Sequence, residues 1–418
     1  MSEYYDPMLF LSSAGNANTM GCTFTLKKPI DGKMLADAAE LLRERFPYFY
    51  VRVKKTENDI VPVPNPLPVT VRNTWEPIVF HTQESNYHLM AIKYEGKRFA
   101  VEIMHALTDG AGFLPYLKSL LFVYLSRKYH LSLDPTGFRL PGQEIPETET
   151  GDPFPHLDID AAEPPLYQKK PIEDFYRIHP DSRGEARVFY LKLPEKEVMR
   201  YCHENDGSPN ALMAVLLARA IRKHDPESEK PLLITIAIDH KAMLGNRESY
   251  RQFANVAEID FPKGRETLDI ARLCTAVRGK LMLQAQPENS LWHAKTLKAM
   301  QQKFDTIPLQ MKFEILAKAS SGARWTASVS YLGSSSFGPL EPYIDEMIIL
   351  AEPNVVDTAL EIACIHHSFY VSFIQSFPED GLCNAFLEEL TAAEIPFERL
   401  RDEKHRLCDI SWDALDNG

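Results

Sequence analysis

The sequence predicts an α/β protein of two similar halves, each with a mixed β-sheet and helices. Stretches with the apolar alternation of β-strands are interleaved with stretches that have the apolar spacing of helices. The order hairpin, short turn, Asp-Gly pair and helix occurs twice, around Asp109-Gly110 and around Asp380-Gly381. The chain of 418 residues also exceeds what one hydrophobic core usually supports.

The two occurrences differ at one position. When the Asp-Gly pairs are aligned, Ser376 takes the place of His105. Two related halves, of which one carries the histidine, are therefore expected. The alternative is a chance match, because hairpin–turn–helix arrangements are common.

The first half, residues 1–150, contains a helix that Asp31 caps and Pro47 ends. Further along, a hairpin across Glu95-Gly96 leads into a short turn and a long helix. The elements expected here are strands at 22–26, 48–53, 87–94 and 97–103 and helices at 31–46 and about 110–129.

Residues 151–185 are expected to be a crossover linker between the halves. Prolines and carboxylates accumulate here and just before it, and such a stretch cannot form a regular core. The domain boundary is therefore placed at this linker, and the second half covers residues 186–418.

The second half begins with a strand, followed by a buried helix that Ser208 caps and Pro209 opens. A continuous apolar run then has the composition of an interior strand. The expected strands are 186–193, 231–238, 325–332, 344–350, 359–365 and 369–374, and the expected helices are 209–222, 267–284, 291–303 and 382–390.

Composition excludes several classes of function. The formal net charge of −12 argues against a nucleic-acid-binding protein. Six scattered cysteines without a CxxC pair indicate reduced thiols, and neither they nor Asp239-His240 and His293 have the spacing of metal ligands. Residues 1–6 lack the features of a signal peptide, and no apolar run reaches membrane-spanning length. A cytoplasmic protein without a metal is expected.

The candidate catalytic residues lie in the turn between the apolar strand residues 99–103 and the helix that follows. His105 falls where a strand ends, and Asp109 falls where a helix begins, so that its carboxylate can cap the helix. A histidine can accept a proton near neutral pH. The alternative is a core histidine whose ring bonds to a backbone carbonyl.

His105-Ala-Leu-Thr-Asp109-Gly110 resembles the His-x-x-x-Asp-Gly signature of the CoA-dependent acyltransferase superfamily. This superfamily includes chloramphenicol acetyltransferase, plant BAHD enzymes, bacterial alcohol and polyketide-associated acyltransferases, and condensation domains of peptide synthetases. Arg45-Phe46-Pro47 after the first helix, the proline-rich crossover and the duplicated halves are similar to family features. The resemblance implies two chloramphenicol-acetyltransferase-like halves that meet at a channel containing the histidine.

The resemblance also implies roles for individual residues. His105 would be the general base, and Asp109 would hold the turn through a salt bridge. Relatives provide an arginine for this bridge, and here Lys241 occupies that place, although it equally fits a solvated turn lysine. Gly110 and Gly112 would let the helix start lie close to its neighbours.

A hydrogen-bond donor for the oxyanion is expected on the strand from Thr326 to Gly333, with Ser330 as the first candidate. The alternative is an ordinary polar strand face. Asn255 stands where relatives carry a Gly-Asn pair, without the glycine. His366-His367 is expected to lie within a strand and to be structural.

The implied function is transfer of an acyl group from a CoA or carrier-protein thioester to a small alcohol or amine, in a ternary complex. CoA would be a co-substrate, and no permanently bound cofactor is expected. Condensation domains carry two adjacent histidines, and Met104 replaces the first, which favours a free-standing acyltransferase. The alternatives are a condensation-type enzyme and a binding protein that lost catalysis. Lys295, Lys298 and Lys303 are either CoA phosphate contacts or a solvated helix face.

Overall fold

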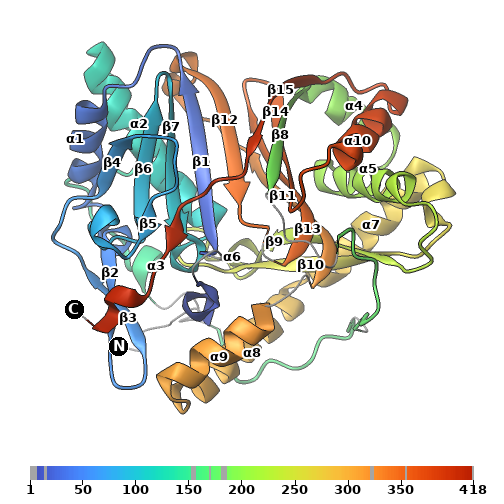
Figure 1. Ribbon diagram of the computed structural model, residues 1–418, viewed down its shortest axis with the longest axis horizontal. Coiled ribbons are helices and arrows are strands. Elements are labelled where there is room, and N and C mark those ends of the chain that lie inside the picture. The colour runs from blue at the N-terminus through green and yellow to red at the C-terminus, as the bar shows by residue number, and fades with distance from the viewer. Residues whose placement is uncertain are drawn as a thin grey trace.

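The computed structural model describes residues 7–13, 17–151, 157–168, 171–179, 186–320, 324–353 and 355–416. Two β-sheets lie side by side, and helices cover the side of each sheet that faces away from the other (Figure 1). The expected mixed α/β architecture of two lobes is confirmed. Residues 1–6, on which the signal-peptide prediction was based, lie outside the described part of the chain.

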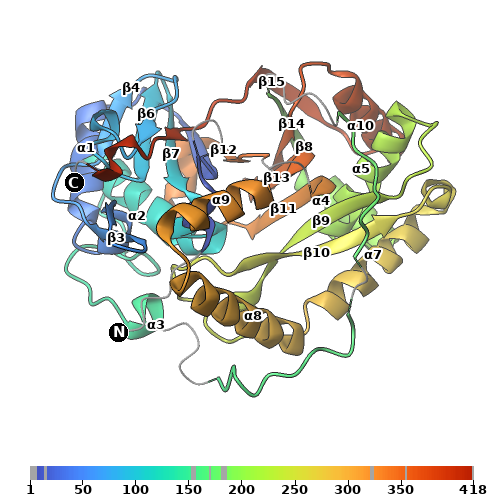
Figure 2. The same ribbon diagram turned by 60° about the horizontal axis from the view of Figure 1, so that its bottom comes forward.

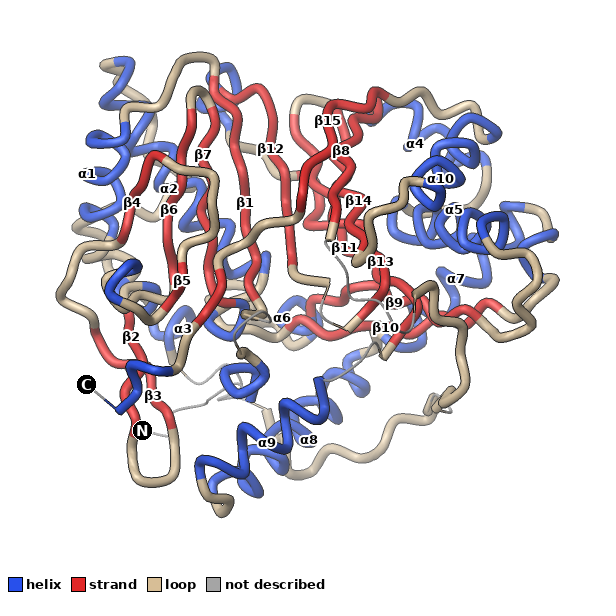
Figure 3. Tube along the Cα trace, viewed as in Figure 1, coloured by secondary structure: helices blue, strands red, loops and turns tan. Residues whose placement is uncertain are grey.

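Within the described residues, the first lobe contains a five-stranded sheet in the order β12-β1-β7-β6-β4. Its neighbouring strands are antiparallel except β4 and β6, which are parallel. The strands are β1 (Thr19–Leu26), β4 (Thr70–Asn73), β6 (Met90–Glu95), β7 (Arg98–Met104) and β12 (Ile344–Ala351). The edge strand β12 comes from the second half of the sequence and forms the edge of the first sheet that lies next to the second sheet (Figures 1 and 3).

The second lobe contains, among the residues described, a seven-stranded sheet in the order β10-β9-β11-β13-β14-β8-β15. Strand β11 is parallel to both of its neighbours, and the other pairs are antiparallel. The strands are β8 (Arg187–Pro194), β9 (Leu232–Asp239), β10 (Ala254–Phe261), β11 (Trp325–Ser334), β13 (Val356–Ile365), β14 (Ser368–Gln375) and β15 (Glu398–Lys404).

Helices α1 and α2 cover the first sheet, and α5 and α10 are prominent on the outer side of the second (Figure 1). The helices are α1 (Gly32–Leu42), α2 (Gly110–Tyr129), α3 (Glu147–Thr150), α4 (Glu195–Glu204), α5 (Pro209–His224), α6 (His240–Met243), α7 (Ile270–Gln284), α8 (Pro287–Asp305), α9 (Leu309–Ser320) and α10 (Gly381–Ala392). None of the described helices has both the length and the apolar composition that a membrane span requires.

Two small ribbons complete the first lobe. Strands β2 (Val51–Lys55) and β3 (Ile60–Pro64) form a hairpin, and the late strand β16 (Asp409–Ile410) pairs with β5 (Val79–Phe80). The Trp412 indole N–H also donates to the carbonyl of Ser12. The C-terminal segment therefore returns to the first lobe. In Figure 2, helix α9 lies in front of this lobe.

The segment before the crossover is anchored, which its composition did not predict. Glu149 on α3 is fully buried, and its carboxylate accepts both terminal N–H groups of Arg45 at 2.7 and 2.8 Å. Arg139 and the Tyr48 hydroxyl also contact it. Within the crossover, residues 152–156, 169–170 and 180–185 lie outside the described residues.

Several elements were missed by the sequence-based predictions, and one turn was placed wrongly. Helices α4 and α9 and strand β10 were not expected. The placement of His366-His367 within a strand is wrong, because both residues form the turn between β13 and β14 with φ of +52° and +53°. Such left-handed φ values at both positions are typical of a two-residue hairpin turn.

Candidate active site

The histidine turn joins the end of β7 to the start of α2. The backbone N–H of His105 donates to the carbonyl of Asn18, which continues the pairing of β7 with β1. Residues His105–Leu107 then form a single 3₁₀ turn, and α2 begins at Gly110. The side chain of His105 is thus positioned by a strand on one side and a helix on the other.

Asp109 is buried among three hydrogen-bond donors. Its Oδ1 caps α2 by accepting from Gly112 N at 2.8 Å, and its Oδ2 accepts from Phe253 N at 3.0 Å. Lys241 Nζ lies 2.5 Å from Oδ1, and both side chains are almost inaccessible. Because Lys241 and Phe253 belong to the second lobe, Asp109 ties the turn across the interface.

The lobes also approach each other closely at the start of α2. Thr108 Oγ1 donates to the carbonyl of Tyr250 at 2.6 Å. A Cβ on Gly112 would lie 2.3 Å from that carbonyl oxygen, and one on Gly110 would lie 2.8 Å from the Leu332 side chain. Both glycines therefore allow contacts that a larger residue would block.

Two cavities meet at His105. A small cavity of about 90 Å³ has a largely apolar lining that includes Phe113, Leu117, Leu332 and Ile349. A large cavity of about 250 Å³ adds polar side chains. Residues that line both cavities stand at their junction, and these are His105, Gly110, Ser330, Ala351 and Glu361.

Ser330 and Glu361 face this junction from neighbouring strands. They are register partners on the parallel strands β11 and β13, and the Ser330 hydroxyl hydrogen-bonds the Glu361 carboxyl group. Burial raises the pKa of Glu361 to about 7. Sequence reasoning missed Glu361, although a lone carboxylate in the apolar run 359–365 is a detectable signal.

Burial also acts on the histidine. It lowers the pKa of His105 below the ordinary value of 6.5, and this outweighs the effect of its own backbone and of the Asp109 carboxylate. The ring is therefore neutral at pH 7. A neutral imidazole beside a cavity can accept a proton from a bound molecule.

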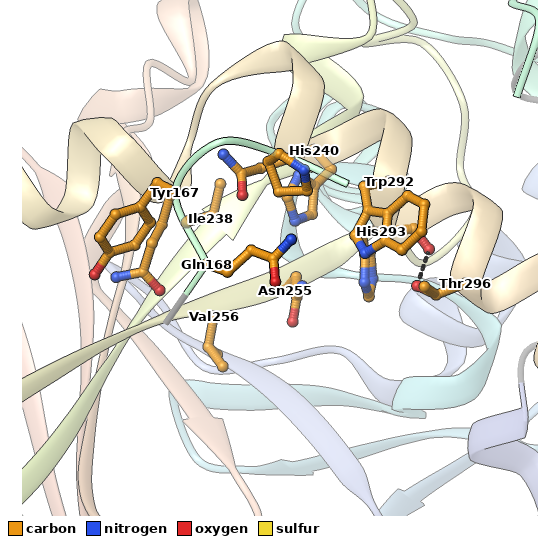
Figure 4. Close-up of a pocket in the computed structure, with 12 residues that line it drawn as sticks. Tyr167, Gln168, Ile238, His240, Asn255, Val256, Trp292, His293 and Thr296 are labelled. Atoms are coloured by element: carbon orange, nitrogen blue, oxygen red, sulfur yellow. Dashed lines mark hydrogen bonds between the residues drawn. The ribbon is translucent and has the colours of Figure 1, made fainter. Parts of the chain in front are cut away.

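A third cavity, of about 310 Å³, adjoins the large one because Asn255 and Val256 line both. His240 and His293 stack here with ring centroids 5.1 Å apart, and Trp292 lies beside them (Figure 4). Burial, followed by the neighbouring His293, lowers the pKa of His240 to about 3. Among the described residues, no group of side chains has the make-up of a metal site.

Other candidates lie elsewhere or have other partners. Lys295 donates to the backbone carbonyls of Asp160 and Ala162, and Lys298 pairs with the Asp160 carboxylate, so both hold the crossover. Lys303 is exposed. In the second lobe, Asp380 is exposed and its side chain does not cap α10, whereas the Ser376 hydroxyl donates to the carbonyl of Asp357.

Solved structures of a condensation domain and of a protein complexed with coenzyme A have the same two-lobed fold. Solved structures with this fold cover more than nine tenths of the chain. Polyketide synthase associated protein 5 from Mycobacterium tuberculosis matches with a TM-score of 0.61 and 14% identity, over 93% of this chain and 97% of that chain.

Two further structures have the same fold. TRI101 of F. sporotrichioides, in complex with coenzyme A and T-2, matches with a TM-score of 0.58 and 11% identity, over 93% and 98% of the two chains. The condensation domain of the Monacolin K polyketide synthase MokA matches with a TM-score of 0.54 and 14% identity, over 92% and 93%. No protein-family model and no curated protein matches the sequence.

Proposed function

We propose that the protein is an acyltransferase that moves an acyl group from a CoA or carrier-protein thioester to an alcohol or amine. One observation carries the proposal: His105, neutral at pH 7, stands where two cavities of different character meet. A donor in one cavity and an acceptor in the other would bring both reacting groups to the same imidazole. The shared fold with the CoA-bound TRI101 supports a thioester as donor.

His105 accepts the proton of the acceptor as its oxygen or nitrogen attacks the thioester carbonyl carbon. The resulting oxyanion needs a hydrogen-bond donor. The candidate at the junction is the Ser330 hydroxyl, whose single O–H turns from the Glu361 carboxyl group to the oxyanion. When the carbon–sulfur bond breaks, His105 returns its proton to the leaving thiolate. Transfer is direct, and no acyl-enzyme forms.

Asp109, Lys241 and Gly110 have supporting roles. The carboxylate of Asp109 is occupied by Lys241, Gly112 N and Phe253 N, and it does not take part in proton transfer. It keeps the turn fixed to the second lobe. Gly110 leaves the space beside Leu332 in which the junction forms.

A binding protein that lost catalysis is the rival proposal. A channel blocked on both sides of His105 would favour it. Two cavities instead border His105, and the buried Asp109–Lys241 pair holds the turn. These observations support the enzyme.

A condensation-type reaction on carrier-bound substrates is the second candidate, because condensation domains share the fold. The acyl donor that each enzyme accepts distinguishes the two candidate functions. A free-standing acyltransferase uses acyl-CoA, whereas a condensation-type enzyme requires the acylated carrier and releases little thiol from CoA thioesters.

The test follows thiol release from acyl-CoA donors of increasing chain length, with pooled alcohols and amines as acceptors. We expect release that depends on an acceptor and falls by about 100-fold or more in His105→Ala, since general-base catalysis contributes about 10²–10⁴-fold. Circular dichroism verifies that the variant is folded. Undiminished release by folded His105→Ala would refute the assignment of the base.

A further inference from the structure

One carboxyl group at the junction of the two cavities has no cationic partner among the described residues. Three carboxylates, Asp109, Glu352 and Glu361, line the large cavity, and among the described residues neither cavity is lined by a lysine or arginine. Lys241 neutralises Asp109 from behind, and Glu352 lies 3.6 Å from the His405 ring. Glu361 makes no ion pair with any residue in the described part of the chain.

Among the described residues, Glu361 is the carboxylate that lines both cavities. It lies on β13 between the buried Leu360 and Ile362, is only 9% exposed, and lines both cavities together with His105. The Ser330 hydroxyl is its hydrogen-bond partner. Its carboxyl group therefore faces the place where an acceptor would meet His105.

Burying a carboxylate without a cation is costly, because water no longer solvates the charge. The pKa of Glu361 is raised because burial disfavours its charged form. A cationic group bound in the cavity would supply the missing counter-charge and a hydrogen-bond donor. Trp325 also lines the large cavity, and an indole ring is a side chain that can attract cations.

We propose that Glu361 binds the ammonium group of the acceptor and takes its first proton, so that the substrate class is a primary amine. The proposal rests on the acyltransferase function above and narrows its acceptor. It assigns two bases to one junction, Glu361 for the first proton and His105 for the second.

The number of protons that the acceptor must lose agrees with the assignment of two bases. An ammonium ion, R–NH₃⁺, must lose two protons to become an amide nitrogen, whereas an alcohol loses only one. Glu361 accepts the first proton and later releases it to solvent. His105 accepts the second as the carbon–nitrogen bond forms, and passes it to the CoA thiolate as the carbon–sulfur bond breaks. The products are the amide, CoA thiol and one proton.

The first experiment measures binding to the full-length chain without acyl donor, by calorimetry at about pH 8. The probes are matched pairs: hexylamine with hexanol, benzylamine with benzyl alcohol, and tryptamine with tryptophol. We expect amines to bind more tightly than their alcohols, and Glu361→Gln to weaken amine binding by about 10- to 100-fold, as for a lost hydrogen bond to a charged group. Equal binding of amine and alcohol, or no effect of Glu361→Gln, overturns the proposal.

The second experiment measures transfer from acetyl-CoA to the pairs that bind. We expect Glu361→Gln to reduce kcat/KM for amines by roughly 100-fold more than it reduces kcat/KM for the matching alcohols. Glu361→Asp should restore part of the amine activity. Glu379→Gln, which removes an exposed carboxylate on the second lobe, is the matched control and should behave like the wild type.

The outcomes separate this proposal from the acyltransferase function. His105-dependent transfer to alcohols that is unchanged in Glu361→Gln, without transfer to amines, overturns the amine proposal and leaves the acyltransferase standing. Thiol release that does not depend on His105 removes the acyltransferase function, and the binding experiment then still decides whether Glu361 holds an ammonium group.

Discussion

His105 and Asp109 are four residues apart but meet different surroundings. His105 borders both cavities, whereas Asp109 is enclosed by donors from α2 and from the second lobe. The motif could be read from the sequence because it is local. Glu361 could not be assigned in the same way, since its importance arises from residues of the other lobe that the chain brings to it.

The variant Asp109→Asn tests whether the Asp109 carboxylate supports the histidine turn. Asparagine can still cap α2, but it leaves the buried Lys241 ammonium without its counter-charge. We expect a loss of roughly 3–5 kcal/mol in the free energy of unfolding, measured in urea. His105→Ala, which breaks no ion pair, should unfold close to the wild type. Equal stability of Asp109→Asn and wild type would exclude the salt bridge as the support of the turn.

At the scale of elements, local signals predicted the capped helices and the two hairpins well. Asp31 caps α1, Ser208 caps α5, and the hairpins β6–β7 and β13–β14 each precede a helix. The transfer of β12 to the first sheet and the pairing of β16 with β5 could not be predicted, because both depend on contacts between distant segments.

Two glycines in helices provide a matched prediction. Gly112→Ala places a Cβ 2.3 Å from the Tyr250 carbonyl oxygen, and we expect it to destabilise the protein by about 1–3 kcal/mol. Gly279→Ala on α7 meets no atom within 4 Å and should stabilise by about 0.5–1 kcal/mol, because alanine favours the helix. Urea unfolding of both variants measures the difference. Stabilisation by Gly112→Ala would contradict the close approach of the lobes.

At the scale of the whole molecule, hydrogen bonds link the segment before the crossover to the lobe interface. The carbonyl of Glu149 accepts the N–H of Tyr250, and the loop that carries Tyr250 also provides Phe253 to Asp109. Arg45 anchors Glu149 to the first lobe. The proline-rich composition predicted a long connection, but it did not predict that Glu149, just before that connection, is packed against the loop of Tyr250.

Arg45→Met should therefore destabilise the protein by roughly 3 kcal/mol, since it removes one partner of a buried pair. It should also increase the KM of the acyl transfer, because the loop around Tyr250 loses support. Arg200→Met, which removes exposed pairs on α4, serves as control and should leave stability and KM unchanged. An unaltered Arg45→Met enzyme would show that this anchor is dispensable.

The central claim is that a neutral His105 at the junction is the base. The most direct test is the pH dependence of kcat/KM for a neutral alcohol acceptor. Burial lowers the pKa of His105, so the base is active above that pKa and activity should fall only as the pH decreases below 6.5. This acidic limb should be absent from the residual activity of His105→Ala. A midpoint above pH 7, or the same limb in His105→Ala, would contradict the account.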